Sequence, residues 1–255
     1  MDPLIALLSA AVGYLLGSVS FARLIARIFR PGQPIGETTV HVPGSQAAFK
    51  YDAISATTIR LNLGPRYGCL TSFLDMLKAA IPVLAFRLWQ PDSYYYLIVG
   101  AMATAGHNWP LYHRFKGGRG MSPILGGMAV VDWLGVLATS AAGLLLGAVA
   151  GDFTFTGNLG VLLMIPWLWF RHHDVALTLY AAGVNGMLWL AMVPEAQEFA
   201  RLRREGMLEE YVRAKHVRIE GPQDGPQMDR ITAAGSLSRF VAWWRRDHEE
   251  SVNDV

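Results

Sequence analysis

Apolar runs that polar residues interrupt at short intervals dominate this sequence. Of the 255 residues, 52% are hydrophobic and only 16% are charged, whereas an ordinary soluble domain carries about 25% charged residues. A helix needs about 20 consecutive apolar residues to cross the ~30 Å hydrocarbon core of a bilayer, and several runs approach or exceed that length. The chain is therefore expected to be an all-α integral membrane protein.

The breaks between the runs predict about seven membrane helices, some of them short. Val131-Asp132-Trp133 interrupts the long run from Ile124 to Ala150, which indicates a short segment followed by a full span. Counted as one span, this run would place the arginine-rich tail outside, against the positive-inside rule; counted as two, it returns the tail to the cytoplasm. The other expected helices are Pro3–Ile28, Tyr67–Trp89, Tyr94–Ala105, Leu159–Phe170 and Val175–Val193.

The first helix sets the expected orientation. Met1 leads directly into an apolar stretch without an Ala-x-Ala-like cleavage site, so this helix is expected to be an uncleaved span rather than a signal peptide. Arg23, Arg27 and Arg30 lie at its end and mark that end as cytoplasmic. Residues 1–193 would then form a transmembrane domain whose N-terminus is outside, followed by a cytoplasmic tail, 194–255.

The polar segments between the runs are expected to contain little regular structure. Residues 31–52 are rich in glycine and proline and predict an irregular cytoplasmic loop. Ser55–Leu63 is too short and too polar to span, so a short interfacial helix fits it better. We expect a turn over 151–158 and a solvated turn at Arg171–Asp174, where adjacent histidines would point away from each other on a helix.

The tail contains two helical candidates. Gln197–Ala214 is rich in arginine, and Phe240–Trp244 is followed by two further arginines. The second candidate is amphipathic, so it would either lie on the membrane surface or pack against another protein chain.

The stretch from Gly106 to Ser122 concentrates glycine and positive charge between two apolar runs. We call its segment Lys116–Gly120 the glycine loop. Its glycines are Gly117, Gly118 and Gly120, and its cations are Lys116 and Arg119. Glycine lets a ligand approach the backbone closely, and consecutive N–H groups in such a turn can form an anion-binding concavity. A helix starting near Ser122 would aim its positive end at the same place. The loop therefore predicts a phosphate site; the alternative is a basic turn that obeys the positive-inside rule and binds nothing.

Asp75 and Lys78 lie at positions i and i+3 of an expected span. Ionisable groups inside a membrane are costly, so they indicate either a paired functional role or an ion pair that only tethers helices. The single cysteine, Cys69, allows no intrachain disulfide, and no metal-ligand spacing is evident, so we expect neither a metal nor a cofactor. A net charge of +2 is too small to indicate nucleic-acid binding.

Three motifs resemble the bacterial acyl-phosphate:glycerol-3-phosphate acyltransferases, over roughly residues 10 to 205. The motifs are Gly13-Tyr14-Leu15-Leu16-Gly17-Ser18, then Ala56-Thr57 with Leu63-Gly64 and Asp75-x-x-Lys78, and above all Gly106-His107-Asn108-Trp109-Pro110 with Phe115-Lys116-Gly117-Gly118-Arg119-Gly120. The resemblance implies a seven-helix enzyme of the bacterial inner membrane whose C-terminus is cytoplasmic. It would make lysophosphatidic acid, for phospholipid synthesis, from an acyl phosphate and glycerol 3-phosphate or a related anionic acceptor.

The resemblance also implies a set of phosphate-binding residues. Lys116, Arg119 and the backbone of Gly117, Gly118 and Gly120 would hold phosphate, with Ser122 beside them. His107 and Asn108 could contact the headgroup, although His107 could equally be a packing residue at a helix end. Arg60 and Arg201 are the candidates for the second anion. The acyl chain would leave between helices into the membrane lipid.

Several family positions carry other residues here. Tyr51 stands at a serine position, Leu61 at an arginine position and Thr58 at an asparagine position. The family has a histidine and an asparagine just before Arg201-Leu202, where this chain has Glu195-Ala196-Gln197-Glu198-Phe199. Two further hypotheses therefore stand beside the enzyme: a structural membrane subunit that docks protein partners through its tail, and a lipid or anion transporter.

Overall fold

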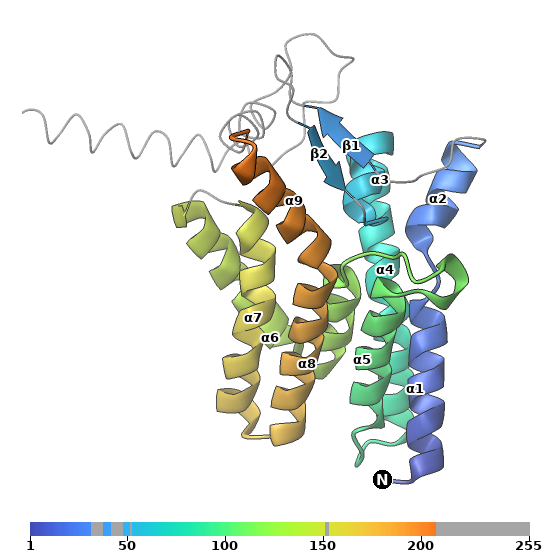
Figure 1. The fold of residues 1–255 in the computed structure, drawn as a ribbon. Helices are drawn as coiled ribbons and strands as arrows, with labels where there is room; N and C mark the ends of the chain where they lie inside the picture. The colour runs from blue at the N-terminus through green and yellow to red at the C-terminus, as the bar shows by residue number, and fades with distance from the viewer. Residues whose placement is uncertain (32–37, 42–47, 52, 151–152, 208–255) are drawn as a thin grey trace, which may run out of the picture.

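The computed structural model describes residues 1–31, 38–41, 48–51, 53–150 and 153–207. They form a bundle of long helices with a small two-stranded sheet at one end (Figure 1). The elements in chain order are α1 (Pro3–Gly17), α2 (Phe21–Phe29), β1 (Thr38–His41), β2 (Ala48–Tyr51), α3 (Ala56–Leu63), α4 (Pro65–Trp89), α5 (Tyr95–Asn108), η1 (Leu111–His113), α6 (Met121–Ala150), α7 (Phe153–His172), α8 (Val175–Ala191) and α9 (Val193–Arg204).

The first expected helix is interrupted, so the prediction of one continuous helix from Pro3 to Ile28 is wrong. α1 ends at Gly17 and α2 begins at Phe21. Ser20 is the N-cap of α2, and its side chain accepts a hydrogen bond from the Arg23 N–H. Ser18 donates back to the Tyr14 carbonyl at 2.8 Å. Ser20 thus satisfies an N–H that a continuous helix would have paired with a backbone carbonyl, whereas the Tyr14 carbonyl keeps its bond from the Ser18 N–H as well.

The prediction of irregular structure for residues 31–52 is wrong where β1 and β2 pair. The two strands are antiparallel, in a register that places Thr38 opposite Tyr51 and His41 opposite Ala48. They contact a distant helix, because the Phe49 ring packs in a tilted arrangement against Phe199 of α9 with centroids 4.8 Å apart. Two other expectations are confirmed: Ser55 directly precedes the short helix α3, and α4 covers the span expected over Tyr67–Trp89.

α6 breaks at Asp132, which has the non-helical angles φ −151° and ψ 91°. Its first half runs parallel to α4, since Ser72 contacts Ser122 and the Arg87 side chain reaches the Val131 carbonyl. Its second half runs antiparallel to α7, since Asp132 contacts His172 while a side chain at Gly160 would meet Ser140.

The remaining helix pairings fix the direction of these halves. α5 and α8 are parallel, as the contacts Tyr94–Asp174 and Asn108–Met187 show, whereas α7 and α8 are joined by a tight turn and are antiparallel. The chain therefore turns back at Asp132, which confirms the expected division of this run into two segments.

Asp132 also organises the turn. Its carboxylate accepts hydrogen bonds from the Gly135 N–H at 2.9 Å and from the Trp167 indole at 3.0 Å, and it pairs with Arg171 at 2.9 Å. His172 is 3.0 Å from the same carboxylate, so the expected solvated turn at Arg171–Asp174 is partly engaged with protein. The turn expected over 151–158 is shorter than predicted, because α7 begins at Phe153. The arginine-rich helix expected over Gln197–Ala214 begins earlier, at Val193, and ends at Arg204, so the expected continuation through residue 207 is wrong. Residues 208–214 and the whole of 240–244 lie outside the described residues.

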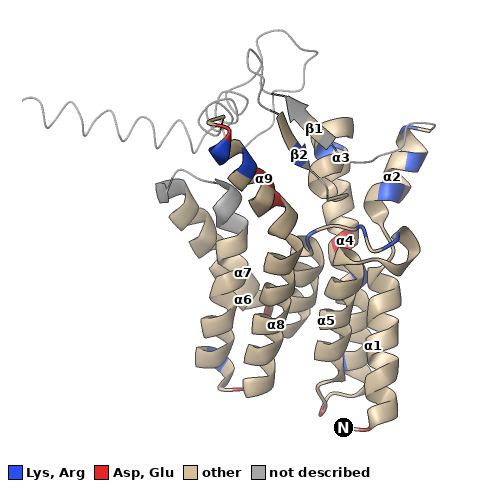
Figure 2. Ribbon diagram, viewed as in Figure 1, with Lys and Arg blue, Asp and Glu red and all other residues tan. Residues whose placement is uncertain are grey.

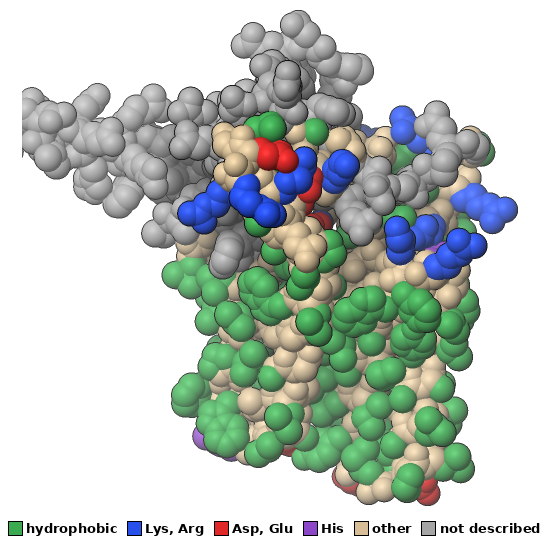
Figure 3. All heavy atoms as spheres, viewed as in Figure 1, with side chains coloured by type: hydrophobic (Ala, Val, Ile, Leu, Met, Phe, Trp, Pro, Cys, Tyr) green, Lys and Arg blue, Asp and Glu red, His purple; other side chains and the backbone are tan. Residues whose placement is uncertain are grey.

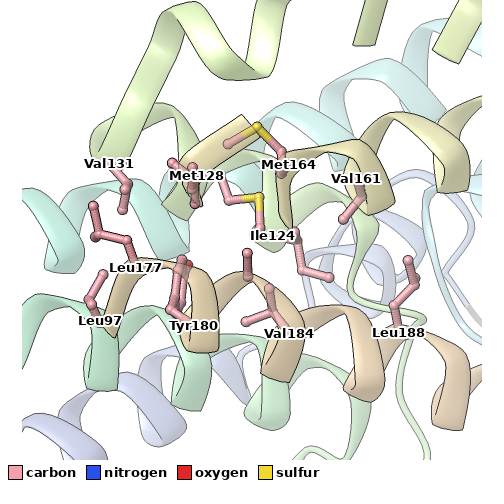
Figure 4. Close-up of a cluster of buried hydrophobic side chains, with 12 residues drawn as sticks. Leu97, Ile124, Met128, Val131, Val161, Met164, Leu177, Tyr180, Val184 and Leu188 are labelled. Atoms are coloured by element: carbon pink, nitrogen blue, oxygen red, sulfur yellow. The ribbon is translucent and has the colours of Figure 1, made fainter. Parts of the chain in front are cut away.

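The largest core cluster lies between α5, α6, α7 and α8 (Figure 4). Its members are Leu97, Ile124, Met128, Val131, Val161, Met164, Leu168, Leu177, Tyr180, Ala181, Val184 and Leu188. Many other large apolar side chains face outward and cover the body of the molecule, while Lys and Arg gather at the end that carries the sheet and α2 (Figures 2 and 3). This is the pattern of a protein whose sides face lipid.

By length and composition alone, three stretches of the described residues could cross a membrane: Pro3–Phe29, Pro65–Trp89 and Met121–Gly147. The first and third are each taken as one helix in this count, although the chain breaks after Gly17 and turns back at Asp132. A fourth is added if α8 and α9, which are bent by 44° relative to each other, count as one span.

Candidate functional site

The segment between α5 and α6 lies at the basic end of the bundle (Figure 2). It is fastened to the N-terminal helices: the Tyr14 hydroxyl donates to the Trp109 carbonyl at 2.8 Å, and the Arg23 guanidinium donates to the Lys116 carbonyl at 2.8 Å. Burial, and the charge of the nearby Arg23, hold the pKa of His113 below its ordinary value. The His113 ring is therefore neutral at pH 7, so Lys and Arg carry the positive charge of this segment.

The glycines of the loop pack against the C-terminal end of α5. A Cβ on Gly117 would overlap the His107 carbonyl, and a Cβ on Gly118 would overlap the His107 ring. Gly120 has a φ of +85°, and a Cβ there would lie 2.6 Å from Asn108 Oδ1. The missing side chains therefore allow the loop to lie directly on α5. The expectation from the sequence was that these glycines make room for a ligand.

Three buried polar side chains form the floor beneath the loop. The Lys78 ammonium lies 2.8 Å from Asp75 Oδ1, 2.8 Å from His107 Nδ1 and 2.8 Å from the Val19 carbonyl in the break between α1 and α2. An ammonium has three donors; here it hydrogen-bonds with the Val19 carbonyl and the His107 ring and forms an ion pair with Asp75. The Nε2 atom of His107 faces Gly118. The Gly118 N–H completes the arrangement by donating to the His107 carbonyl at 3.0 Å.

A cavity of about 130 Å³ opens between the glycine loop and α9. Asn108 contributes an unusual group: its Nδ2 donates to the Met187 carbonyl at 3.2 Å, while its buried Oδ1 has no hydrogen-bond partner among the described residues. This oxygen is fully covered and lies beside Gly120, so leaving it unpaired costs stability. The lining residues are Ala53, Asn108, Trp109, Phe115, Lys116, Gly117, Gly118, Leu190, Ala191, Pro194 and Glu195.

Arg119 and Glu195 form an ion pair beside the cavity. Glu195 lies in the first turn of α9 and is only 7% exposed, and the Arg119 side chain is mostly covered. Sequence reasoning noted Glu195 only as a departure from the family's motif. The sequence does carry a signal for this residue: a carboxylate directly after Pro194, in the first turn of a helix, is a position that favours negative charge.

α9 is joined to the strands and, through them, to the loop. The Lys50 N–H donates to Glu198 Oε1 at 3.2 Å, and Arg201 donates to the Ala48 carbonyl at 2.9 Å. Beyond β2, the Ile54 N–H donates to the Gly117 carbonyl at 3.0 Å. The strands, α9 and the glycine loop are therefore linked by hydrogen bonds, and Ala53, just after β2, lines the cavity.

The structure brings only part of the expected residue set to the cavity. Asn108, Lys116, Gly117 and Gly118 line it, Arg119 reaches Glu195, and His107 supports the loop from below. Gly120 and Ser122 lie at the start of α6, where the Ser122 hydroxyl is 2.8 Å from that of Ser72.

Arg60 and Arg201, the residues expected to meet a second anion, do not line the cavity. Arg60 is exposed on α3. Arg201 pairs with Glu198 at 2.7 Å and Glu205 at 3.4 Å, so its charge already stabilises α9 and the strand beside it.

A family model described as glycerol-3-phosphate acyltransferase matches residues 7–204. The chain belongs to this family. The glycerol-3-phosphate acyltransferase of Zymomonas mobilis is 28% identical over 235 residues, which cover 86% of this chain and 98% of the relative. That of Tolumonas auensis is 35% identical over 185 residues, which cover 65% of this chain and 84% of the relative.

Solved structures agree with this assignment. The lysophosphatidic acid form of an integral membrane glycerol 3-phosphate acyltransferase matches with a TM-score of 0.62 and 25% identity, covering 79% of this chain and 93% of that one. A glycerol 3-phosphate form matches with a TM-score of 0.63 and 24% identity over the same shares, which shows the fold. The expected resemblance and the helical integral membrane architecture are thus confirmed.

Proposed function

We propose that this protein is a membrane acyltransferase that acylates glycerol 3-phosphate and so forms lysophosphatidic acid for phospholipid synthesis. The observation that carries the proposal is the cavity between the glycine loop and α9. Lys116 lines the cavity and brings positive charge for a phosphate, and Asn108 lines it and brings an amide group for a hydroxyl. A phosphorylated polyol combines these two groups in one small molecule.

The proposed donor is an acyl phosphate. A hydroxyl oxygen of glycerol 3-phosphate attacks the acyl carbonyl carbon, the bond from that carbon to the phosphate oxygen breaks, and phosphate leaves with the electron pair. The phosphate of the acceptor takes the hydroxyl proton. Because phosphate is already a good leaving group, the protein mainly has to orient two anions and stabilise charge, which is the contribution of the glycine loop.

The proposed topology has seven membrane segments: α1, α4, α5, the two halves of α6, α7 and α8. The directions derived for these segments place the glycine loop, the strands and the end of α8 on one side, and Lys and Arg gather there (Figure 2). By the positive-inside rule that side is cytoplasmic. The N-terminus is then outside the bacterial inner membrane, and residues 194–255 form a cytoplasmic extension of the membrane domain 1–193.

An assay of the purified full chain tests the proposed reaction. Palmitoyl phosphate and glycerol 3-phosphate should yield lysophosphatidic acid, and Lys116→Ala should reduce the rate strongly. A competent family member serves as the positive control. Absence of product from this chain, while that control is active, would rule out the reaction and return the structural-subunit hypothesis to first place.

A further inference from the structure

The carboxylate of Glu195 lies beside the glycine loop, at the position where the phosphate of a ligand would contact a cation. Glu195 lines the cavity together with Lys116 and Gly118, and it pairs with Arg119, the second cation of the loop. Both partners are largely removed from water, with side-chain exposures of 9% for Glu195 and 18% for Arg119. A charge pair in such a place is strongly coupled, because screening by water is weak.

A phosphate monoester cannot share this position with Glu195 at no cost. Two like charges within a few ångströms of each other in a poorly solvated site repel strongly. A dianion that approaches the loop must therefore either separate Glu195 from Arg119 or bind with Glu195 as a repelling neighbour. In both cases the glutamate lowers the affinity of the loop for anions.

We propose that Glu195 is a specificity-determining residue that acts as an internal competitor for phosphate at Arg119. Its carboxylate sets how strongly the loop binds a phosphate monoester and selects ligands whose second contact, a hydroxyl at the Asn108 side chain that lines the cavity, compensates for the repulsion. Inorganic phosphate, which lacks the polyol arm, is then held weakly. This inference rests on the proposed phosphate-binding role of the glycine loop.

The test compares ligand affinities of the purified full chain and its Glu195→Gln variant by calorimetry. Glutamine keeps the shape of glutamate and removes the charge. We expect the dissociation constants of glycerol 3-phosphate and inorganic phosphate to fall by about tenfold or more, the size of effect produced by about one pKa unit of electrostatic interaction. The constant for glycerol, a neutral ligand, should not change.

Glu205→Gln is the matched control. Glu205 lies at the other end of α9 and pairs with Arg201 rather than with the loop, so its variant should bind both anions as the wild type does. Glu195→Asp provides a second measurement if the glutamine variant is unstable. Its shorter side chain weakens the contact with Arg119 but keeps the charge, so an intermediate affinity is expected.

The other outcomes overturn the inference in distinguishable ways. Unchanged affinity in Glu195→Gln means that the carboxylate does not compete at the anion position. Weaker binding means that Glu195 is itself a ligand-binding group. If the wild type makes lysophosphatidic acid, either of these results removes the inference and leaves the proposed function standing. If neither the wild type nor the variant binds anions and no product forms, both the inference and the proposed function are removed.

Discussion

The cavity has two walls, the glycine loop (the loop wall) and α9 (the α9 wall), and different kinds of contact hold them in place. On one side, the glycine loop lies directly on the end of α5, over the buried charges of Asp75 and Lys78, and has no room for added atoms. On the other side, α9 is attached through side chains: the largely buried ion pair of Glu195 with Arg119 and, farther along the helix, the ring contact of Phe199 and the partly exposed ion pair of Arg201.

This difference explains which part of the family's pattern the chain keeps. The glycines of the loop wall lie so close to the end of α5 that a side chain added at any of them would overlap it, so substitution there disrupts the packing. The α9 wall tolerates change, because side chains at its surface can exchange partners. Where the family has a histidine and an asparagine, this chain uses Glu195 to pair with the loop and Glu198 to bind β2.

The largest expected effect comes from the floor of the loop wall. Asp75→Ala leaves the Lys78 ammonium buried without its carboxylate, and breaking a buried ion pair in this way costs about 3–5 kcal/mol. Thermal unfolding in detergent should show a large loss of stability. The double variant Asp75→Leu with Lys78→Met removes both charges and should recover much of that loss. Equal stability of Asp75→Ala and the wild type would show that the pair does not support the wall.

The glycines of the loop provide the second test. Gly118→Ala places a methyl group against the His107 ring, so we expect a cost of about 1–3 kcal/mol, typical of an overfilled site, together with weaker binding of glycerol 3-phosphate. Gly183→Ala is the matched control, because nothing lies within 4 Å of the Cβ position there. If the two variants behave alike in both measurements, the loop is not tightly packed on α5.

Features that depend on local sequence pattern are predicted from the sequence, whereas features that depend on contacts between distant segments are not. Apolar length and the charged interruption at Asp132 depend on local pattern, so α4, α8 and the break in α6 follow from the sequence. The interruption after Gly17 does not, because it depends on contacts of Ser18 and Val19 with residues far along the chain.

The site divides in the same way. The motif around Gly118 identifies the loop wall from sequence alone. The pairing of β2 with α9 and the contact of Glu195 with the loop join segments that are far apart in the chain, and no local periodicity reports them. Arg201 was a candidate for the second anion; in the fold it pairs with Glu198 and Glu205, a pairing that the sequence does not report.

A smaller effect is expected at the ring contact of the α9 wall. Phe199→Ala removes the stacking partner of Phe49, and aromatic pairs contribute about 0.5–1.5 kcal/mol beyond their buried area. The β2 amides should then exchange hydrogen faster, with protection factors reduced by about tenfold or more, while those of α4 and α5 stay unchanged. Loss of protection in α4 as well would mean that the two walls unfold together.

The smallest expected effect is a pH dependence confined to the α9 wall. Hydrogen bonds from Arg201, more than opposing burial, hold the pKa of Glu198 below its ordinary value. A carboxyl whose pKa is lower in the folded state stabilises that state fully above its unfolded pKa, about 4.3 for glutamate, and loses this contribution as pH falls through the folded value. Because an ion pair of this exposure contributes about 0–1 kcal/mol, only local loosening is expected.

The amide of Lys50 reports this loosening directly, because it donates to Glu198 Oε1. Its protection factor should be constant near neutral pH and should fall in acid below about pH 4, whereas that of the Gly118 amide should not change. Glu198→Gln should remove the acid dependence and leave a lower, constant protection, while Glu205→Gln should retain it. An acid dependence of equal size at Gly118 would show that protonation of Glu198 is transmitted across the cavity, and the two walls would then have to be treated as one unit.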